Sequence, residues 1–154
     1  MRQQGGFSYV IVMFLVAALS LASVRALENT LVAEQRDKEE ELLWRGMAYR
    51  EAIRDYYVNA PGSAQSYPEA VSELLYDGRF TNPRRHLRKR YGDPMAPDGE
   101  WELVRNEDDR VIGVRSRSNV RPIKREGFSD DLASFANAER YSDWQFIYVP
   151  KAKE

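Results

Sequence analysis

The side chains best suited to binding chemistry lie in one short basic run. Five permanently charged residues fall within seven positions: Arg84, Arg85, Arg88, Lys89 and Arg90. Such a run can contact an acidic partner subunit, anionic lipid headgroups or nucleic acid. The alternative is a solvated surface whose charges pair with acidic residues elsewhere, with His86 as a surface or hydrogen-bonded residue. No aromatic residues are interleaved with the run, which disfavours nucleic acid as a partner.

Six aspartates are a second candidate for site chemistry, because carboxylates bind calcium: Asp93, Asp98, Asp108, Asp109, Asp130 and Asp131. Calcium takes about six to eight oxygen ligands that converge on one point, and the spacing of these residues matches no dedicated calcium loop. Asp is also common in turns, where its carboxylate bonds to nearby backbone amides. We therefore expect local roles in turns and no metal site.

Composition excludes several classes of function. The 154 residues include 23 basic and 24 acidic side chains, no Cys and one His. Disulfides, thiolate sites and multi-histidine metal sites are therefore excluded. The chain has no phosphate-binding loop, no nucleophile-elbow serine and no zinc-ligand spacing. We expect one ordinary domain with an appendage, not an enzyme and without a cofactor; a hydrolase that uses acidic residues is the remaining enzymatic alternative.

Residues 7–24 carry no charge and lie between Arg2 and Arg25. Their sequence is FSYVIVMFLVAALSLASV, which as a helix spans about 27 Å, close to the hydrocarbon thickness of a bilayer. A lone segment in lipid must be helical to satisfy its backbone groups. We predict a transmembrane helix here. The alternative is a cleaved secretory signal, which the small residues between Ala18 and Ser23 would suit.

Helix-forming sequence continues from the apolar segment to residue 59. Residues 25–59 contain no Pro and one Gly, and a stop signal follows at 59–62. Apolar positions recur at steps of four and three: Leu42, Gly46, Tyr49, Ile53 and Tyr56. This spacing predicts one buried helix face. We expect a helical stem over 25–60 that continues the apolar segment, and this continuity disfavours a cleaved signal.

Residues 61–154 have shorter patterns and form the expected head. A helix is predicted over 66–76 with Ser66 as its N-cap, and a short helix or turn over 83–91. Three strands are predicted, with a turn at 106–109 between the first two: 101–104, 111–114 and 144–149.

The remaining head segment, 116–142, has no regular pattern. We expect it to be packed by its aromatic residues: Phe128, Phe135 and Tyr141. Three strands can bury only one face, and the apolar stripe of the stem can cover that face. The predicted fold class is therefore α+β, with a long N-terminal helix packed on a small antiparallel sheet.

The first residues of the chain resemble the leader of type IV pilins and of type II secretion pseudopilins. In that family a short basic leader ends in Gly, the next residue is usually Phe, and a hydrophobic helix follows. Here Arg2, Gly6 and Phe7 match, so residues 1–6 are the expected leader. The head is similar to a pseudopilin-like group in several places: residues 84–88, residues 91–95, Trp101, Gly113 and residues 142–144.

The resemblance implies a processed membrane subunit. A prepilin peptidase would cleave between Gly6 and Phe7, and the new amino group of Phe7 would be methylated. The apolar helix would stay in the bacterial inner membrane as a single pass, with the head in the periplasm. The implied partners are other pseudopilins and the inner-membrane assembly platform. The charges that flank the segment do not set this orientation, which is implied by the leader alone.

Ile11 departs from the family pattern. It occupies the fifth mature position, where the family often has a Glu that pairs with the terminal amine of a neighbour. An ionised carboxylate persists in hydrocarbon only when it is paired, so Ile11 removes that docking interaction. This departure favours a minor or tip subunit over the major subunit of a filament.

Two other functions stay open. The chain could be a secreted or periplasmic binding domain with a cleaved signal, in which case the mature protein would begin near Ser23 or Leu27. It could also be a single-pass membrane scaffold that is unrelated to filaments and is never processed. The mature N-terminus separates these functions from a pseudopilin, which would begin at Phe7.

Overall fold

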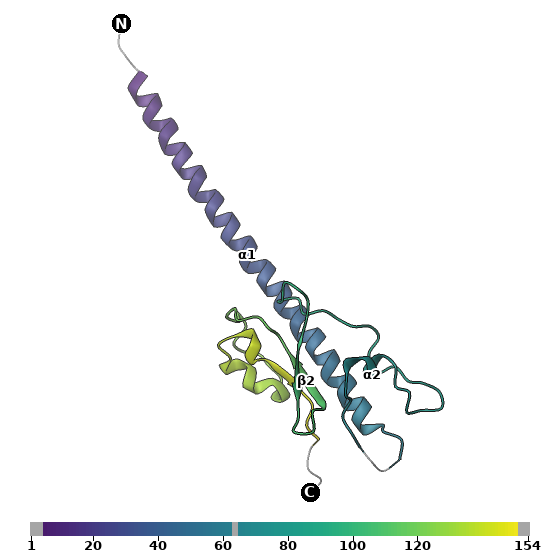
Figure 1. The fold of residues 1–154 in the computed structure, drawn as a ribbon. Coiled ribbons are helices and arrows are strands. Elements are labelled where there is room, and N and C mark those ends of the chain that lie inside the picture. Colours follow the sequence, from purple (N-terminus) through teal and green to yellow (C-terminus); the bar gives the residue numbers. More distant parts are fainter. Residues whose placement is uncertain (1–4, 63–64, 151–154) are drawn as a thin grey trace. The chain divides into compact units, whose positions relative to one another are not determined.

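The helix predicted over 7–59 is a single element in the computed structural model, which describes residues 5–62 and 65–150. Helix α1 spans Gly5–Val58 (Figure 1). It ends where the stop signal predicts, because the backbone N–H and the side-chain amide of Asn59 both donate to the carbonyl of Asp55, at 3.1 and 3.0 Å. Of the expected leader, residues 1–4 lie outside the described part of the chain.

The chain divides into two units, residues 1–37 and residues 38–154. The first unit contains the apolar part of α1. The second contains the remainder of α1 and the head, so the predicted stem contributes residues to both units. The helix and the sheet described below confirm the predicted α+β fold class.

The sheet of the second unit has three antiparallel strands in the order β1–β2–β3: Glu102–Arg105, Val111–Arg115 and Gln145–Ile147. The pairing of Leu103 with Val114, and of Val114 with Phe146, places these three apolar side chains on one face. The predicted turn is confirmed, since the side-chain oxygen of Asn106 accepts from the backbone N–H groups of Asp108 and Arg110. All three predicted strands are therefore present, with the third shorter than predicted.

The apolar stripe of the stem covers this face of the sheet. Leu42, Tyr49, Ile53 and Tyr56 are each at most 3% exposed. Gly46 lies directly against the ring of Phe146, because a Cβ at this position would come within 2.4 Å of the ring. The stripe predicted from the steps of four and three is therefore confirmed, and its one glycine permits the closest approach.

Aromatic residues from the 116–142 segment complete the core, as predicted. The ring of Phe135 stacks on Trp144 at 5.3 Å, and both Tyr141 and Phe128 contact Trp144 edge-on. The segment is not irregular throughout, however. It contains two 3-10 helices, η1 (Asp130–Asn137) and η2 (Tyr141–Asp143), which are too short for helical periodicity to be visible in the sequence.

The helix predicted over 66–76 is shorter in the structure than in the prediction. Helix α2 covers only Val71–Leu75, and Ser66 is not its N-cap; Ala70 holds that position without a side-chain hydrogen bond. The residues before it are held differently, since the carbonyl of the buried Pro68 accepts from the N–H of Val111 at 2.8 Å. Residues 83–91, for which the sequence left a short helix or a turn open, form no helix.

A buried carboxylate on α1 holds the start of the 116–142 segment. Glu39 is 4% exposed, and its oxygens accept the backbone N–H groups of Ile123 and Lys124 at 3.1 and 3.0 Å. These two amides follow Pro122, whose ring has no N–H to donate. A charge-assisted pair of this kind compensates for the loss of water around the carboxylate. Glu39 therefore anchors this segment to the stem.

We predict that Glu39→Gln lowers the free energy of unfolding by about 1–3 kcal/mol, because the amide loses the charge that the two N–H groups face. Glu40→Gln is the matched control, since Glu40 is exposed, and it should change stability by less than about 0.5 kcal/mol. Urea unfolding of the full chain in detergent, followed by tryptophan fluorescence, measures both. Equal midpoints for the two variants would contradict the anchoring role.

Candidate functional site

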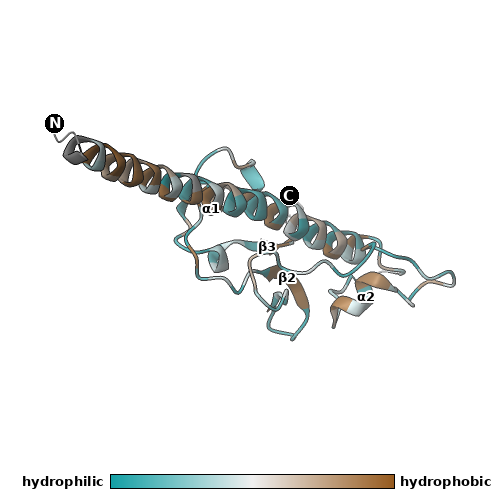
Figure 2. Ribbon diagram, turned by 90° about the horizontal axis from the view of Figure 1, so that it is seen from above, coloured by the Kyte–Doolittle hydropathy of each residue, from teal (hydrophilic) through white to brown (hydrophobic). Residues whose placement is uncertain are grey.

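The described residues of the apolar segment, 8–24, are exposed on every side of α1 in the isolated chain. Phe14 is 76% exposed, and Leu19 and Leu21 are nearly as open. Figure 2 shows this part of α1 as the most hydrophobic part of the helix. The helix is long and apolar enough to cross a membrane, with a mean hydropathy of 2.3 over its best window. This agrees with the predicted transmembrane segment at the level of length and composition.

Two polar side chains of this segment are hydrogen-bonded within the helix. The hydroxyls of Ser20 and Ser23 donate to the carbonyls of Val16 and Leu19, at 2.8 and 2.9 Å. In hydrocarbon an unsatisfied hydroxyl would be costly, so this back-bonding suits the segment to lipid. Ile11 lies within this stretch and is 43% exposed. Gly6 and Phe7 both fall within α1, which begins at Gly5.

The basic run lies on a loop whose backbone is firmly attached to the head. Residue 77 forms an antiparallel bridge with Arg84, in which the N–H of Asp77 donates to the Arg84 carbonyl at 2.8 Å. The N–H groups of His86 and Leu87 both donate to the carbonyl of Leu74 at 2.9 Å. Leu87 is buried in the core. The loop is therefore fixed by its backbone and by one apolar side chain.

A buried ionic network lies beneath the loop. Asp77 is 1% exposed; Arg79 donates to its carboxylate at 2.8 and 2.9 Å, and His86 Nε2 lies 3.0 Å from Oδ2. Burial by itself raises the pKa of Asp77, but the hydrogen bonds from Arg79 and His86 outweigh burial and hold that pKa well below its ordinary value. His86 is thus a hydrogen-bonded residue, as one of the two interpretations of the sequence predicts.

The same network reaches α1 through Tyr56. The guanidinium of Arg79 lies over the Tyr56 ring, 3.4 Å from its centroid, and donates to the Tyr56 carbonyl at 2.8 Å. The Tyr56 hydroxyl donates to Glu73. Burial raises the pKa of Tyr56, and the bond to Glu73 raises it further. The end of the stem, α2 and the basic loop are therefore linked by one set of polar contacts.

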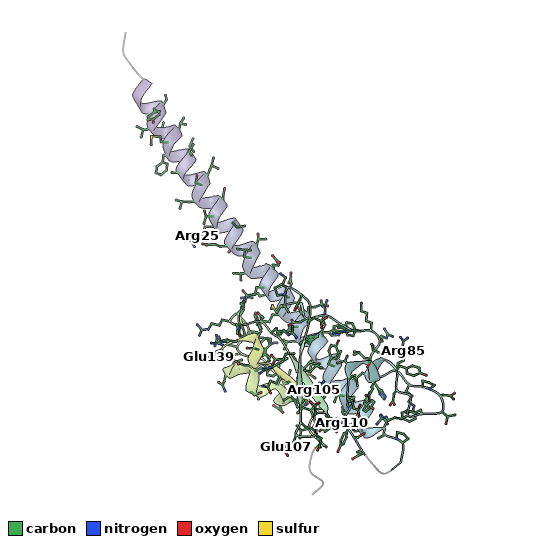
Figure 3. All side chains as sticks on the ribbon, viewed as in Figure 1. Arg25, Arg85, Arg105, Glu107, Arg110 and Glu139 are labelled. Carbon is green, nitrogen blue, oxygen red and sulfur yellow. The ribbon has the colours of Figure 1, made fainter. Side chains whose placement is uncertain are left out.

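The charges of the run itself point away from this network. Arg84, Arg85, Arg88, Lys89 and Arg90 are all exposed, and Figure 3 shows Arg85 at the outer edge of the head. Arg90 pairs with Glu100 at 2.5 Å. Within residues 65–150 the other four have no acidic partner: Arg84 lies over the Phe80 ring, Arg85 donates to a carbonyl, and Lys89 lies over Tyr91. Within residues 65–150, Arg90 is therefore the one cation of the run whose charge is compensated by an acidic side chain.

The six aspartates do not converge on one point. Asp93 is buried and accepts from the Ser116 hydroxyl at 2.7 Å and from the Met95 N–H at 2.8 Å. Asp98 accepts from the N–H of Glu100. Asp108 and Asp109 form the strand turn, and Asp131 pairs with Arg50 at 3.5 Å. The described residues contain no group of three or more His, Asp or Glu side chains placed to hold a metal ion.

Comparisons of this chain with protein-family models, with curated proteins and with solved structures give no match.

Two structural residues escaped the sequence analysis. Arg79 lies outside the 84–90 run, and its importance comes from the burial of Asp77, which no local pattern indicates. Glu39 lies one step of three before Leu42, so it continues the apolar stripe of the stem, and this spacing distinguishes it from Glu40 and Glu41. Its partners are two backbone amides far along the chain, which leave no signal in the sequence.

We predict that Asp77→Asn destabilises the chain at neutral pH by about 1–3 kcal/mol and flattens its acid unfolding. The folded-state pKa of Asp77 is depressed, so its contribution to stability is present above the unfolded pKa of about 3.9 and is lost as pH falls below it. The measurement is the urea midpoint of the full chain between about pH 6 and pH 3.

The matched control for this prediction is Asp130→Asn, because Asp130 is exposed and makes no described polar contact. It should leave both the neutral-pH midpoint and the slope below about pH 4 close to wild type. An Asp77→Asn curve that is parallel to wild type in acid would contradict the account of the buried network.

Proposed function

We propose that this chain is a pseudopilin-like subunit of a type II secretion or related type IV filament system. The observation that carries the proposal is the apolar segment that directly follows Gly6, which is exposed on every side of α1 over residues 8–24 and belongs to the same helix as the stem to Val58. A pseudopilin requires a leader junction, a membrane helix and an α+β head in this order. The sequence supplies the first, and the structure is consistent with the other two.

In the proposed role, the apolar helix is buried first in lipid and later among neighbouring subunits. The free energy of an aliphatic side chain changes little when apolar protein neighbours replace lipid around it. Helix packing and contacts between subunits therefore determine assembly. Small residues permit close packing of helices, and several occur here: Ala17, Ala18, Ser20, Ala22 and Ser23. The subunit could therefore leave the membrane without exposing its helix to water.

The continuity of α1 supports retention of the segment over its removal. A cleaved signal would end between Ser23 and Leu27, yet these residues lie inside an unbroken helix. The residues that follow are needed by the head, because the stripe beginning at Leu42 covers the sheet. We propose no catalytic role, and the partners are those implied by the resemblance: other pseudopilins, the inner-membrane assembly platform and a prepilin peptidase. With Ile11 in the usual Glu position, a minor subunit is the proposed variant.

We predict that Gly6→Val blocks processing, because the peptidase in this family requires Gly as the last leader residue. The matched control is the neighbouring Gly5→Val, which should still be processed. Both variants are expressed as full chains in a bacterium with a prepilin peptidase and in the same strain without it. Electrophoretic mobility then separates precursor from mature chain.

The expected result is conversion to the mature form for wild type and Gly5→Val in the peptidase strain only. Identical mobility of the wild-type chain in the two strains would overturn the proposed processing. Cleavage of Gly6→Val at a site beyond residue 22 would instead support the secreted binding domain, and a wild-type chain that is never shortened would support the membrane scaffold.

A further inference from the structure

Four exposed cations on the head have no ionic partner within the described residues 65–150, and we call them the basic strip: Arg84, Arg85, Arg88 and Lys89. The two carboxylates that flank the strip along the chain are buried and already hydrogen-bonded, Asp77 by Arg79 and His86 and Asp93 by Ser116 and Met95. The other cation of the run, Arg90, is paired with Glu100. The strip therefore carries four positive charges that the fold brings together and does not neutralise.

The strip is held in place by residues that alternate with it. His86 and Leu87 point inward, to Asp77 and into the core, while the residues on either side of them point outward. The backbone of the loop donates twice to Leu74. The loop therefore loses much of its conformational entropy during folding. Less entropy is lost when a partner binds, which favours binding to this surface.

The strip is connected to α1 through aromatic rings. Lys89, its last cation, lies over the ring of Tyr91, 5.4 Å from the centroid, and Tyr91 contacts the Trp44 ring edge-on at 5.0 Å. His86, between the two pairs of cations, contacts the Tyr56 ring at 5.6 Å. Trp44 is 56% exposed, although it is a large aromatic residue. An exposed indole therefore lies next to the ring that Lys89 covers.

We propose that the basic strip and Trp44 form a docking surface for an acidic segment of another protein. Arg and Trp are among the residues enriched at the energetic centres of protein interfaces, and four uncompensated positive charges favour a partner of opposite sign. The four cations fall within six consecutive residues of one loop, a span that a short acidic segment of a polypeptide can match. Nucleic acid is disfavoured because no aromatic residues alternate with the cations to stack bases.

The proposal concerns the head alone and goes beyond the proposed membrane role. Its test makes no use of processing at Gly6, so a failure of one is distinguishable from a failure of the other. The full chain is placed in nanodiscs of phosphatidylcholine, which carries no net charge. The probe is a fluorescein-labelled peptide of repeating Glu-Ala-Glu-Leu, and binding is measured by fluorescence anisotropy at about 150 mM salt, where weak surface attraction is screened.

We predict that the double variant Arg88→Ala, Lys89→Ala weakens peptide binding by about tenfold or more. The matched control is the pair Lys124→Ala, Arg125→Ala, which also removes two adjacent exposed cations and should weaken binding less than about twofold. Trp44→Ala changes no charge and should weaken binding by about threefold or more. Equal thermal midpoints of the variants, measured by circular dichroism, establish that the head is folded.

Three outcomes would overturn the proposal. The first is equal weakening by the two double variants, which would indicate attraction by net charge alone. The second is binding to phosphatidylglycerol nanodiscs or to a single-stranded oligonucleotide that depends on the strip when the acidic peptide does not bind. The third is an unchanged affinity for the peptide after Trp44→Ala.

Discussion

Residues 8–24 are apolar on every side of their helix, and this property determines the environment that the chain needs. A helix with one apolar face can be covered by a small head, whereas a helix that is apolar all round needs an apolar environment of its own. Each large side chain left in water forgoes about 1.5–3 kcal/mol of burial. The hydroxyls of Ser20 and Ser23 are already bonded within the helix, so lipid leaves neither of them unsatisfied.

The later part of α1 differs, because it has one apolar face and this face is buried in the head. Three strands of three to five residues bury only one face, and that face is covered by the stripe from Leu42 to Tyr56. Gly46 lets the helix approach the Phe146 ring, and Glu39 holds the segment that carries the 3-10 helices. Asp77 and Arg79 join the end of the stem to α2 and the basic loop. The head therefore depends on the helix for its core.

The sequence predicted what depends on local pattern. The stem stripe follows from helical periodicity and the strands from alternation around the Asn106 turn, since both signals lie in a few consecutive residues. Two features of the loops were missed or misassigned. Ser66 was expected to cap a helix, but Pro68 bonds to Val111, far along the chain. The isolation of Arg88 and Lys89 from acidic partners was equally invisible, because it depends on where all the carboxylates of the head lie after folding.

The central claim is that the apolar segment remains part of the mature protein and lies in a membrane. The intact mass of the wild-type chain, extracted from the membrane fraction of a bacterium with a prepilin peptidase, tests this most directly. The account predicts a single membrane-bound species that begins at Phe7 and carries one added methyl group. A soluble species that begins between Ser23 and Leu27, and so lacks the apolar segment, would contradict it.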